Sequence, residues 1–342
     1  MSGLFEKSGW VRAYGETVAK GKIRSIPEDF IVEEILGFEP SGEGEHHFLK
    51  IEKTGENSEW IAKLLARHVG IKRRDVGFAG LKDRQAKTVQ WFSVHIPRKS
   101  EIDWSSIETE TIKLLEQTKH NKKLRRGIHK GNRFELTIRQ LEGDQERLEK
   151  RLQLIAQQGV PNYFGLQRFG IGGRNIDRAE ALFRGEIKVR DRAKKGFYLS
   201  AARSFIFNAL VSERVSQKSW DCLLPGDVAQ LDGSGSCFKV SAIDELIQKR
   251  LVAMDIHPTA CLWGRGELMS SGDARFQEQA VIDRFPLLRD GLVKAGLEQS
   301  RRSVRLSVKA LSWSFPETTI LKIKFLLPSG GFATAVLNEL IG

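Results

Sequence analysis

The spacing of apolar residues changes along the chain, and this change most limits what the sequence can fold into. Apolar and polar residues alternate in residues 22–36, 45–54 and 88–97, and again near the C-terminus in RSVRLSVKALSWSF and TTILKIKFLLP. A period of two is typical of β-strands, whose successive side chains point to opposite faces. From about residue 160 the pattern is mostly helical. Strands at both ends of a helical middle predict one sheet that is interrupted by an insertion.

Two helices are predicted within the first half of the chain. In ENSEWIAKLLARHVG the apolar residues recur at helical spacing, Asn57 or Ser58 can cap the start, and Gly70 can end the helix. A second helix is predicted over residues 143–159, where leucine and isoleucine share one face and Gly159 marks the end. The first part of the chain is therefore expected to mix strands and helices.

The charge of the chain favours a polyanionic partner. Its 342 residues carry a net charge of +12, and 40% of them are hydrophobic, which suits a globular protein of one large or two ordinary domains. Nucleic acid or an anionic membrane surface would match such an excess of cations. No apolar stretch approaches the ~20 residues that span a bilayer, and the N-terminus lacks the apolar core of a signal peptide. A cytoplasmic protein without a membrane partner is expected.

The sequence predicts neither a metal nor a cofactor. Cys222, Cys237 and Cys261 are too widely spaced for a metal knuckle and are expected to be reduced thiols. His46 and His47 are adjacent, so on a strand they would face opposite sides and could not share one metal. The sequence contains no P-loop, no dinucleotide-binding fingerprint and no nucleophile elbow.

Asp83 stands out in the segment GFAGLKDRQAKTVQWFS. Gly77 and Gly80 allow a tight backbone path before it, and Lys82 and Arg84 flank it. Cationic neighbours keep a carboxylate ionised and available as a nucleophile or base, and they can hold phosphates on either side of a target nucleotide. The alternative is an aspartate that caps a turn or forms a surface ion pair.

Side-chain alternation is clear in two expected strands, and the second of them carries residues that suit a nucleobase. Alternation places Phe30, Val32 and Glu34 on one strand face, and Asn132 and Phe134 on one face of a strand in GNRFELTIR. The amide of Asn132 offers the donor and acceptor that read a base edge, and Phe134 can stack on a base. Ordinary core packing is the alternative for Phe134.

Two basic stretches could hold backbone phosphates. Residues 119–133 contain seven Lys or Arg and no acid, and residues 184–195 are also rich in cations. Such runs bind phosphates through charge alone. A solvated surface without a ligand is the alternative.

The chain resembles the TruD family of tRNA pseudouridine synthases in seven blocks of sequence that occur in order from about residue 20 to the C-terminus. These blocks are IPEDFIVEE, GEGEHHFLKIEKTGEN, GFAGLKDRQAKTVQWFS, KGNRFELTIR, VPNYFGLQRFGIGGRN, LSAARSFIFN and LPSGGFATAVLNEL. Each long block is specific, so the chain is identified as a member of this family on the sequence alone.

The resemblance implies an α+β fold with two domains. A catalytic pseudouridine synthase domain, with a mostly antiparallel mixed sheet flanked by helices, would comprise residues 1–159 and 304–342. An inserted α/β domain, the TRUD domain, would comprise residues 160–303.

The resemblance also implies site residues. The catalytic aspartate falls on Asp83, and the active-site basic residue falls on Arg24, where many relatives have lysine. The base-binding residues fall on Phe30, Asn132, Phe134 and Phe332.

The implied reaction is the isomerisation of uridine to pseudouridine at position 13 of tRNA, in the D-arm region, by a monomer without a cofactor. It breaks the bond from C1′ to N1, turns the uracil and joins C1′ to C5.

Two other classes of protein compete with this interpretation. A non-catalytic RNA-binding protein or RNA chaperone would explain the charge equally well but not an aspartate kept among cations. A metal-dependent nuclease would need clustered acids, and Asp83 has no acidic neighbour between Gly77 and Ser100.

Overall fold

The structure, a computed structural model, describes residues 9–82, 85–97 and 102–342. Asp83 and Arg84 therefore lie outside the described residues. The chain forms two compact units, which are described separately. The sheet unit comprises residues 19–145 and 309–330 with Gly342, and the helical unit comprises the chain up to residue 18 with residues 146–308 and 331–341.

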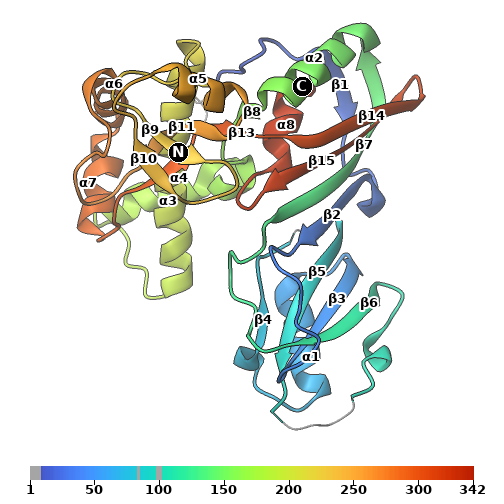
Figure 1. Ribbon diagram of the computed structural model, residues 1–342. Coiled ribbons are helices and arrows are strands. Elements are labelled where there is room, and N and C mark those ends of the chain that lie inside the picture. The colour runs from blue at the N-terminus through green and yellow to red at the C-terminus, as the bar shows by residue number, and fades with distance from the viewer. Residues whose placement is uncertain (1–8, 83–84, 98–101) are drawn as a thin grey trace. The chain divides into compact units, whose positions relative to one another are not determined.

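The sheet unit is built on one mixed sheet (Figure 1). Its strands lie in the order β14, β15, β7, β2, β5, β3, β6, while β1 pairs with β7 and β4 with β5. Strands β2 and β5 pair in parallel, and the other neighbours pair antiparallel. The strands are β1 (Ala19–Lys22), β2 (Phe30–Ile35), β3 (His46–Thr54), β4 (Val76–Phe78), β5 (Lys87–His95), β6 (Ile112–His120), β7 (Gly131–Gly143), β14 (Lys309–Glu317) and β15 (Ile320–Pro328).

The two ends of the sequence meet in this sheet. Strand β15 pairs along its whole length with β7, so that Phe325 lies opposite Phe134. The expected mostly antiparallel mixed sheet is therefore confirmed, as is the expectation that early and late strands share it.

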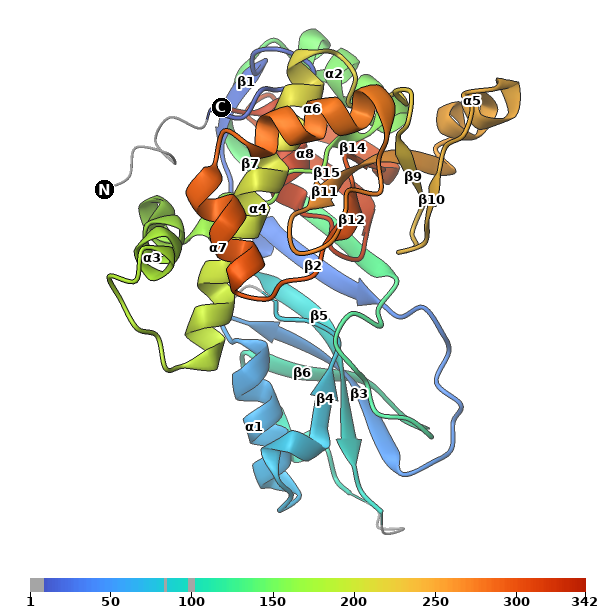
Figure 2. The ribbon, with the colours of Figure 1, turned by 90° about the vertical axis from the view of Figure 1, so that its left-hand side faces the viewer.

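Helix α1 (Ser58–His68) covers one face of the sheet unit (Figures 1 and 2). The side chain of Asn57 accepts a hydrogen bond from the backbone N–H of Trp60 at 2.8 Å, so Asn57 is the cap. Gly70 follows the helix with φ of +68°, a left-handed conformation that favours glycine. The fully buried Ile61 and Leu65 pack on residues of β3, β4 and β5. The predicted bounds of this helix are confirmed to within two residues.

The helical unit contains a smaller sheet and most of the helices (Figure 2). Strands β10, β9, β11 and β12 form this sheet in that order, and β8 pairs with β13. The long helix α4 packs against β11 and against α6 and α7. The helices are α2 (Gln145–Gln158), α3 (Arg174–Phe183), α4 (Arg192–Ser216), α5 (Glu245–Val252), α6 (Gly272–Ile282), α7 (Pro286–Lys294) and α8 (Ala333–Leu340), and the strands are β8 (Val160–Pro161), β9 (Val228–Leu231), β10 (Cys237–Lys239), β11 (Ile256–Leu262), β12 (Ser300–Ser303) and β13 (Arg305–Leu306).

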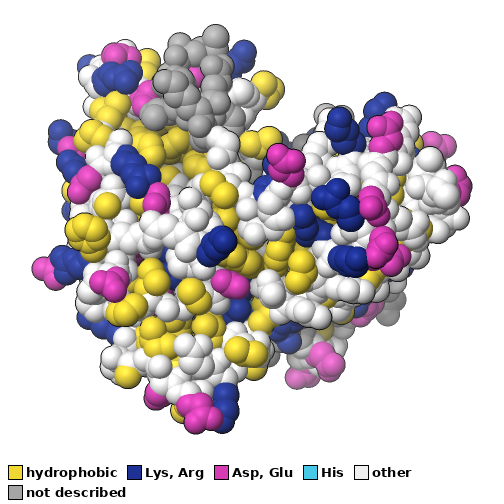
Figure 3. All heavy atoms as spheres, turned by 90° about the horizontal axis from the view of Figure 1, so that it is seen from above, with side chains coloured by type: hydrophobic (Ala, Val, Ile, Leu, Met, Phe, Trp, Pro, Cys, Tyr) yellow, Lys and Arg dark blue, Asp and Glu magenta, His cyan; other side chains and the backbone are white. Residues whose placement is uncertain are grey.

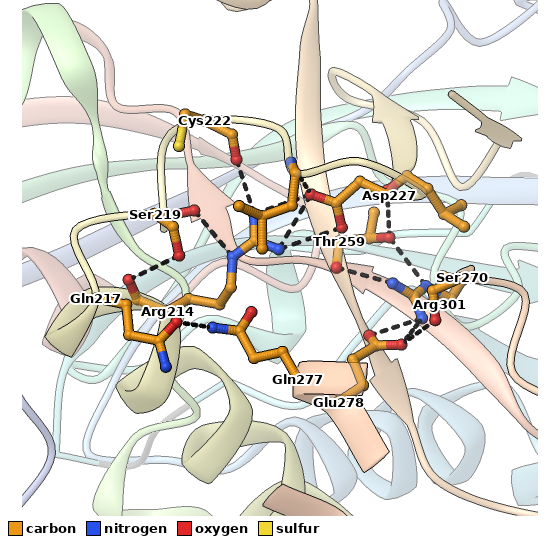
Figure 4. A network of polar contacts seen from close by, with 12 residues as sticks. Arg214, Gln217, Ser219, Cys222, Asp227, Thr259, Ser270, Gln277, Glu278 and Arg301 are labelled. Atoms are coloured by element: carbon orange, nitrogen blue, oxygen red, sulfur yellow. Dashed lines mark hydrogen bonds and ion pairs between the residues drawn. The ribbon is translucent and has the colours of Figure 1, made fainter. Parts of the chain in front are cut away.

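A buried ionic network fixes the helical unit from within (Figure 4). Arg214 donates to both carboxylate oxygens of Asp227, at 3.0 and 3.2 Å, and both side chains are almost fully buried. Arg301 lies 2.8 Å from Glu278, which also accepts from Ser270. Buried pairs of this kind cost desolvation, which complete hydrogen bonding offsets. They fix the relative positions of α4, α6 and the small sheet.

Three further expectations can be compared with the structure. The predicted insertion, residues 160–303, lies inside the helical unit, whose own bounds are wider because α2, α8 and residues 9–18 belong to it. The three cysteines, all of which the structure describes, form no disulfide. Within the described residues, no helix is long and apolar enough to cross a membrane.

Candidate active site

The backbone that leads to Asp83 is held from several sides. The amide N–H of Lys82 donates to the hydroxyl of Ser58 at 3.1 Å, and that hydroxyl donates to Gln90 at 2.7 Å. The amide of Gln90 in turn donates to the carbonyl of Gly80. Ser58 and Gln90 are fully buried, so these bonds are shielded from water. The first residue of α1 and the middle of β5 thus position the chain just before Asp83.

The structure explains why glycine is needed at position 77 of this segment but not at position 80. A Cβ atom on Gly77 would lie 2.4 Å from the carbonyl oxygen of Leu124, so a side chain cannot fit there. At Gly80 the nearest atom to a Cβ would be 3.8 Å away, in the ring of His129, which is an ordinary contact. Close approach therefore requires glycine at 77 and not at 80.

Lys82 is turned into the protein toward Glu34 and Asn132. Its ammonium lies 3.2 Å from Oε2 of Glu34 and donates to Oδ1 of Asn132. Only 8% of the Lys82 side chain and none of the Glu34 side chain is exposed. Glu34 on β2 and Asn132 on β7 are direct cross-strand neighbours, which explains how one ammonium contacts both. In this structure Lys82 binds these two side chains, so its expected contact with a phosphate finds no support here.

Burial sets the ionisation of this cluster. It raises the pKa of Glu34 and lowers the pKa of Lys82, while the charge of each partner acts against the shift of the other. Removing one member of such a pair leaves an uncompensated buried charge. His129 lies beside this cluster, and burial together with the charge of Lys82 lowers its pKa to about 4. His129 is therefore neutral at physiological pH.

A row of aromatic rings continues the same face of the sheet. Phe134 stacks on Phe325 with ring centres 5.4 Å apart, and Phe30 meets Phe134 edge-on at 6.3 Å. Phe30 and Phe134 are 4% and 6% exposed, so both are packed as core residues in this state. The guanidinium carbon of Arg24 lies 4.2 Å from the centre of the Phe30 ring. Arg24 has φ of 59°, which is rare for a residue with a side chain.

The structure brings most of the predicted site residues together. The buried face carries Phe30 and Glu34 on β2, four residues apart, and Asn132 and Phe134 on β7, two residues apart. Asn132 lies directly opposite Glu34. Phe332 belongs to the helical unit, where it precedes α8. The sequence reasoning missed the roles of Glu34, Ser58 and Gln90. The sequence did contain a signal for Glu34, because a carboxylate that is buried on the same strand face as Phe30 needs a cationic or hydrogen-bonding partner.

The two basic stretches are only partly available to a ligand. Arg133 pairs with Glu33 at 2.7 Å, and Arg184 lies 3.5 Å from Glu180. Lys123 donates to the backbone carbonyl of Arg74. Lys122, Arg125 and Arg126 are exposed and remain candidates for phosphate contacts. Figure 3 shows Lys and Arg interspersed with Asp and Glu on one face of the molecule, so the net charge is not gathered on that face.

Among the described residues, no three His, Cys, Asp or Glu side chains are placed to hold a metal ion. The expectation that the reaction uses no metal rests on the sequence and stays a prediction.

Comparison with known proteins identifies the family. The family model described as tRNA pseudouridine synthase D (TruD) matches residues 12–188 and 178–340. A tRNA pseudouridine synthase D of Methylococcus capsulatus is 48% identical over 330 residues, which cover 96% of this chain and 93% of that protein. One of Aeromonas hydrophila is 49% identical over 328 residues, covering 96% and 92%.

A solved structure shares the fold. The crystal structure of a putative tRNA pseudouridine synthase D from Methanosarcina mazei matches with a TM-score of 0.72 at 21% identity, and the match covers 97% of this chain and 95% of that one. The α+β architecture is thus that of a known fold. With the family model and the relatives matching nearly the whole chain, the chain belongs to the TruD family of tRNA pseudouridine synthases.

Proposed function

We propose that this protein isomerises a uridine of tRNA to pseudouridine, with Asp83 as the catalytic residue. The observation that carries the proposal is the match to the family over 96% of the chain. The geometry of the sheet unit supports it: Lys82, the neighbour of Asp83 in the chain, donates to Asn132, which shares a strand face with Phe134. A base-reading amide and an aromatic row thus lie beside the segment that carries the aspartate.

The reaction needs little beyond positioning and one carboxylate. The bond between C1′ and N1 breaks, a bond between C1′ and C5 forms, N1 gains a proton and C5 loses one, so substrate and product are isomers. Asp83 either attacks C1′ or removes a proton from the sugar, and both routes leave the detached uracil in the site. The uridine must first leave its stack, and Phe30, Phe134, Phe332 and Asn132 would hold it afterwards. Arg24 would keep Asp83 ionised.

The finer assignments follow the family and remain part of the proposal. They place the target at position 13, in the D-arm region of tRNA, with a catalytic domain of residues 1–159 and 304–342 and an inserted domain of residues 160–303. They also make the enzyme a monomer that needs no cofactor or metal and works in the cytoplasm, where tRNA is processed.

The substitution Asp83→Asn tests the proposal. It should abolish pseudouridine formation while the dissociation constant for tRNA rises less than tenfold, because phosphate contacts supply most of the affinity. Pseudouridine is mapped in tRNA after incubation with each variant, and binding is measured on the same preparations. Asp75→Asn, which removes an acid from the short turn before β4, should leave both properties unchanged.

Turnover by the Asp83→Asn variant would remove the residue from the catalytic role. Absence of pseudouridine with the wild-type protein as well, despite tight binding, would favour the RNA-binding or chaperone function.

A further inference from the structure

The segment that leads into α4 carries cations without acidic partners. Helix α3 ends at Phe183 and α4 begins at Arg192, and the chain between them runs along the surface of the helical unit (Figure 2). In the described part of the chain, no side-chain hydrogen bond or ion pair engages five exposed cations of this segment: Lys188, Arg190, Arg192, Lys194 and Lys195. An exposed arginine elsewhere in the unit, Arg265, instead pairs with Glu298 at 2.7 Å. The charge of the segment is therefore open to a ligand.

The two acids of this segment do not neutralise the five cations. The carboxylate of Asp191 accepts hydrogen bonds from the backbone N–H groups of Ala193 and Lys194, at 2.8 and 3.1 Å, so it caps the start of α4. Glu186 lies 3.9 Å from Arg184, which is not one of the five. The segment thus keeps a local excess of positive charge.

The cations at the start of α4 do not stabilise the helix. The N-terminus of a helix carries a partial positive charge, which disfavours cations in the first turn. The first turn of α4 nevertheless contains Arg192, Lys194 and Lys195, and no acid. These like charges also repel one another. A polyanion bound here would offset both costs, whereas the helix alone gains nothing from this choice of residues.

An exposed aromatic ring follows the cations on the same helix. Phe197 is 57% exposed, and it lies three residues after Lys194, so the two side chains are neighbours on the helix surface. Proteins that bind single-stranded nucleic acid combine cations along the backbone with aromatic rings on which bases stack. Phe197 and its cationic neighbours have this combination.

We propose that residues 188–197 form an RNA-binding surface, which contacts phosphates of tRNA through its cations and an unpaired base through Phe197. The inference rests on the proposed function, which supplies the RNA. The surface consists of residues other than those proposed to hold the target uridine, so it adds a separate contact with the same substrate. An anionic membrane would match the charge equally well, but it has no bases on which an aromatic ring could stack.

The salt dependence of tRNA binding tests the inference. The combined variant Arg192→Gln, Lys194→Gln, Lys195→Gln, here called the α4 variant, should reduce the slope of log affinity against log salt. The reduction should be up to about 2 to 3, since each neutralised phosphate accounts for about 0.7 to 0.9. The same variant should melt at an equal or higher temperature than the wild type, because it removes cations from the start of a helix.

The matched control removes the same three charges elsewhere in the helical unit. It replaces with Gln one arginine and two lysines that are also exposed: Arg275, Lys218 and Lys239. The control should leave the slope unchanged.

A separate variant tests the aromatic contact. Phe197→Ala should weaken tRNA binding at least fivefold without changing the salt slope, because a stacked ring releases no counterions. Binding as tight as that of the wild type would overturn the stacking contact.

The outcomes separate this inference from the proposed function. An unchanged slope for the folded α4 variant, or an equal reduction in the control, would overturn the RNA surface even if the wild-type protein forms pseudouridine. A reduced slope in the α4 variant alone, in a protein that forms no pseudouridine, would keep the surface and reject the reaction. If the α4 variant binds tRNA like the wild type but loses binding to phosphatidylserine vesicles, the surface faces a membrane and the assignment to RNA is wrong.

Discussion

At the scale of single residues, Glu34 and Lys82 link the core of the sheet unit to the candidate chemistry. Lys82 precedes Asp83 in the chain, and its ammonium is bound by a carboxylate with no exposed surface. A buried pair is a poor source of net stability, but it has one favoured geometry. The pair therefore contributes more to positioning the chain just before Asp83 than to the net stability of the fold.

Glu34→Gln should slow pseudouridine formation at least tenfold, because Lys82 loses the charge that holds it. The free energy of unfolding should fall by about 3–5 kcal/mol, the usual cost of leaving a buried charge unpaired. Adding Lys82→Met should restore much of the stability but not the rate. Urea unfolding and single-turnover rates measure the two effects.

Glu33→Gln is the matched control for this experiment. Glu33 is the adjacent acid on β2, where it pairs with Lys50 and Arg133 on partly exposed surface. Such pairs contribute at most about 1 kcal/mol, so this variant should melt and react like the wild type. Equal rates for both variants would mean that Glu34 does not position the site.

Phe134 can be tested against a ring that packs on it from the neighbouring strand. Phe134→Leu and Phe325→Leu should each lower the free energy of unfolding by about 1 kcal/mol, because each removes one partner of the stacked pair. If Phe134 also holds the uracil, only Phe134→Leu should slow catalysis, by about ten- to a hundredfold for a stacking energy of ~1–3 kcal/mol. Thermal melts and single-turnover rates on the same preparations separate packing from stacking. Equal loss of stability with normal turnover in both variants would leave Phe134 as a core residue alone.

At the scale of elements, local sequence patterns predicted the structural features that depend only on residues close together in the chain. The bounds of α1 and the shared face of Phe30, Val32 and Glu34 follow from periodicity and capping, and the structure identifies Asn57 as the cap from the two predicted candidates, Asn57 and Ser58. The contact between Glu34 and Lys82 does not, because it joins residues far apart in sequence through the parallel pairing of β2 with β5. For the same reason the sequence did not predict the hydrogen bond that the backbone N–H of Lys82 donates to Ser58, because this bond depends on where α1 packs on the sheet.

The loop between β6 and β7 carries the exposed cations that could bind phosphates. Replacing Lys122, Arg125 and Arg126 together with Gln should reduce the salt slope of tRNA binding by up to about 2 to 3, since each phosphate that the protein neutralises accounts for about 0.7 to 0.9. Lys123 is left unchanged because it donates to the backbone of Arg74. The control replaces the exposed Lys63, Arg67 and Lys72 on and after α1, which changes the net charge equally. If both triple variants shift the slope alike, the loop acts only through overall charge.

At the scale of the whole molecule, each unit is assembled from segments that are distant in sequence. In the helical unit, Glu339 near the C-terminus accepts hydrogen bonds from the backbone N–H groups of Ala13 and Tyr14, both at 3.2 Å. Tyr14 donates its hydroxyl to the carbonyl of Gly159 at 2.6 Å. Arg151 on α2 donates to the carbonyl of Glu339 at 2.8 Å. One buried carboxylate thus joins the segment that contains Ala13 and Tyr14 to α8.

Glu339→Ala should destabilise the helical unit although it lies outside the proposed site. It leaves two backbone N–H groups without an acceptor, which costs about 1–3 kcal/mol for each buried group. Glu339→Gln should cost much less at pH 7. Burial raises the pKa of Glu339. The folded wild-type protein therefore loses stability as the pH rises through that pKa and the carboxyl group ionises, whereas the neutral amide of the Gln variant does not titrate. The advantage of wild type over the Gln variant should therefore be largest below about pH 4.5 and shrink toward pH 7.

Thermal melts across this range, with the exposed Glu298→Gln as the control, measure the difference, and limited proteolysis shows whether residues 9–18 detach first. An Ala variant that melts like wild type and keeps its N-terminal segment protected would mean that the ring contacts of Trp10 with Tyr163 and Phe205 hold that segment without Glu339.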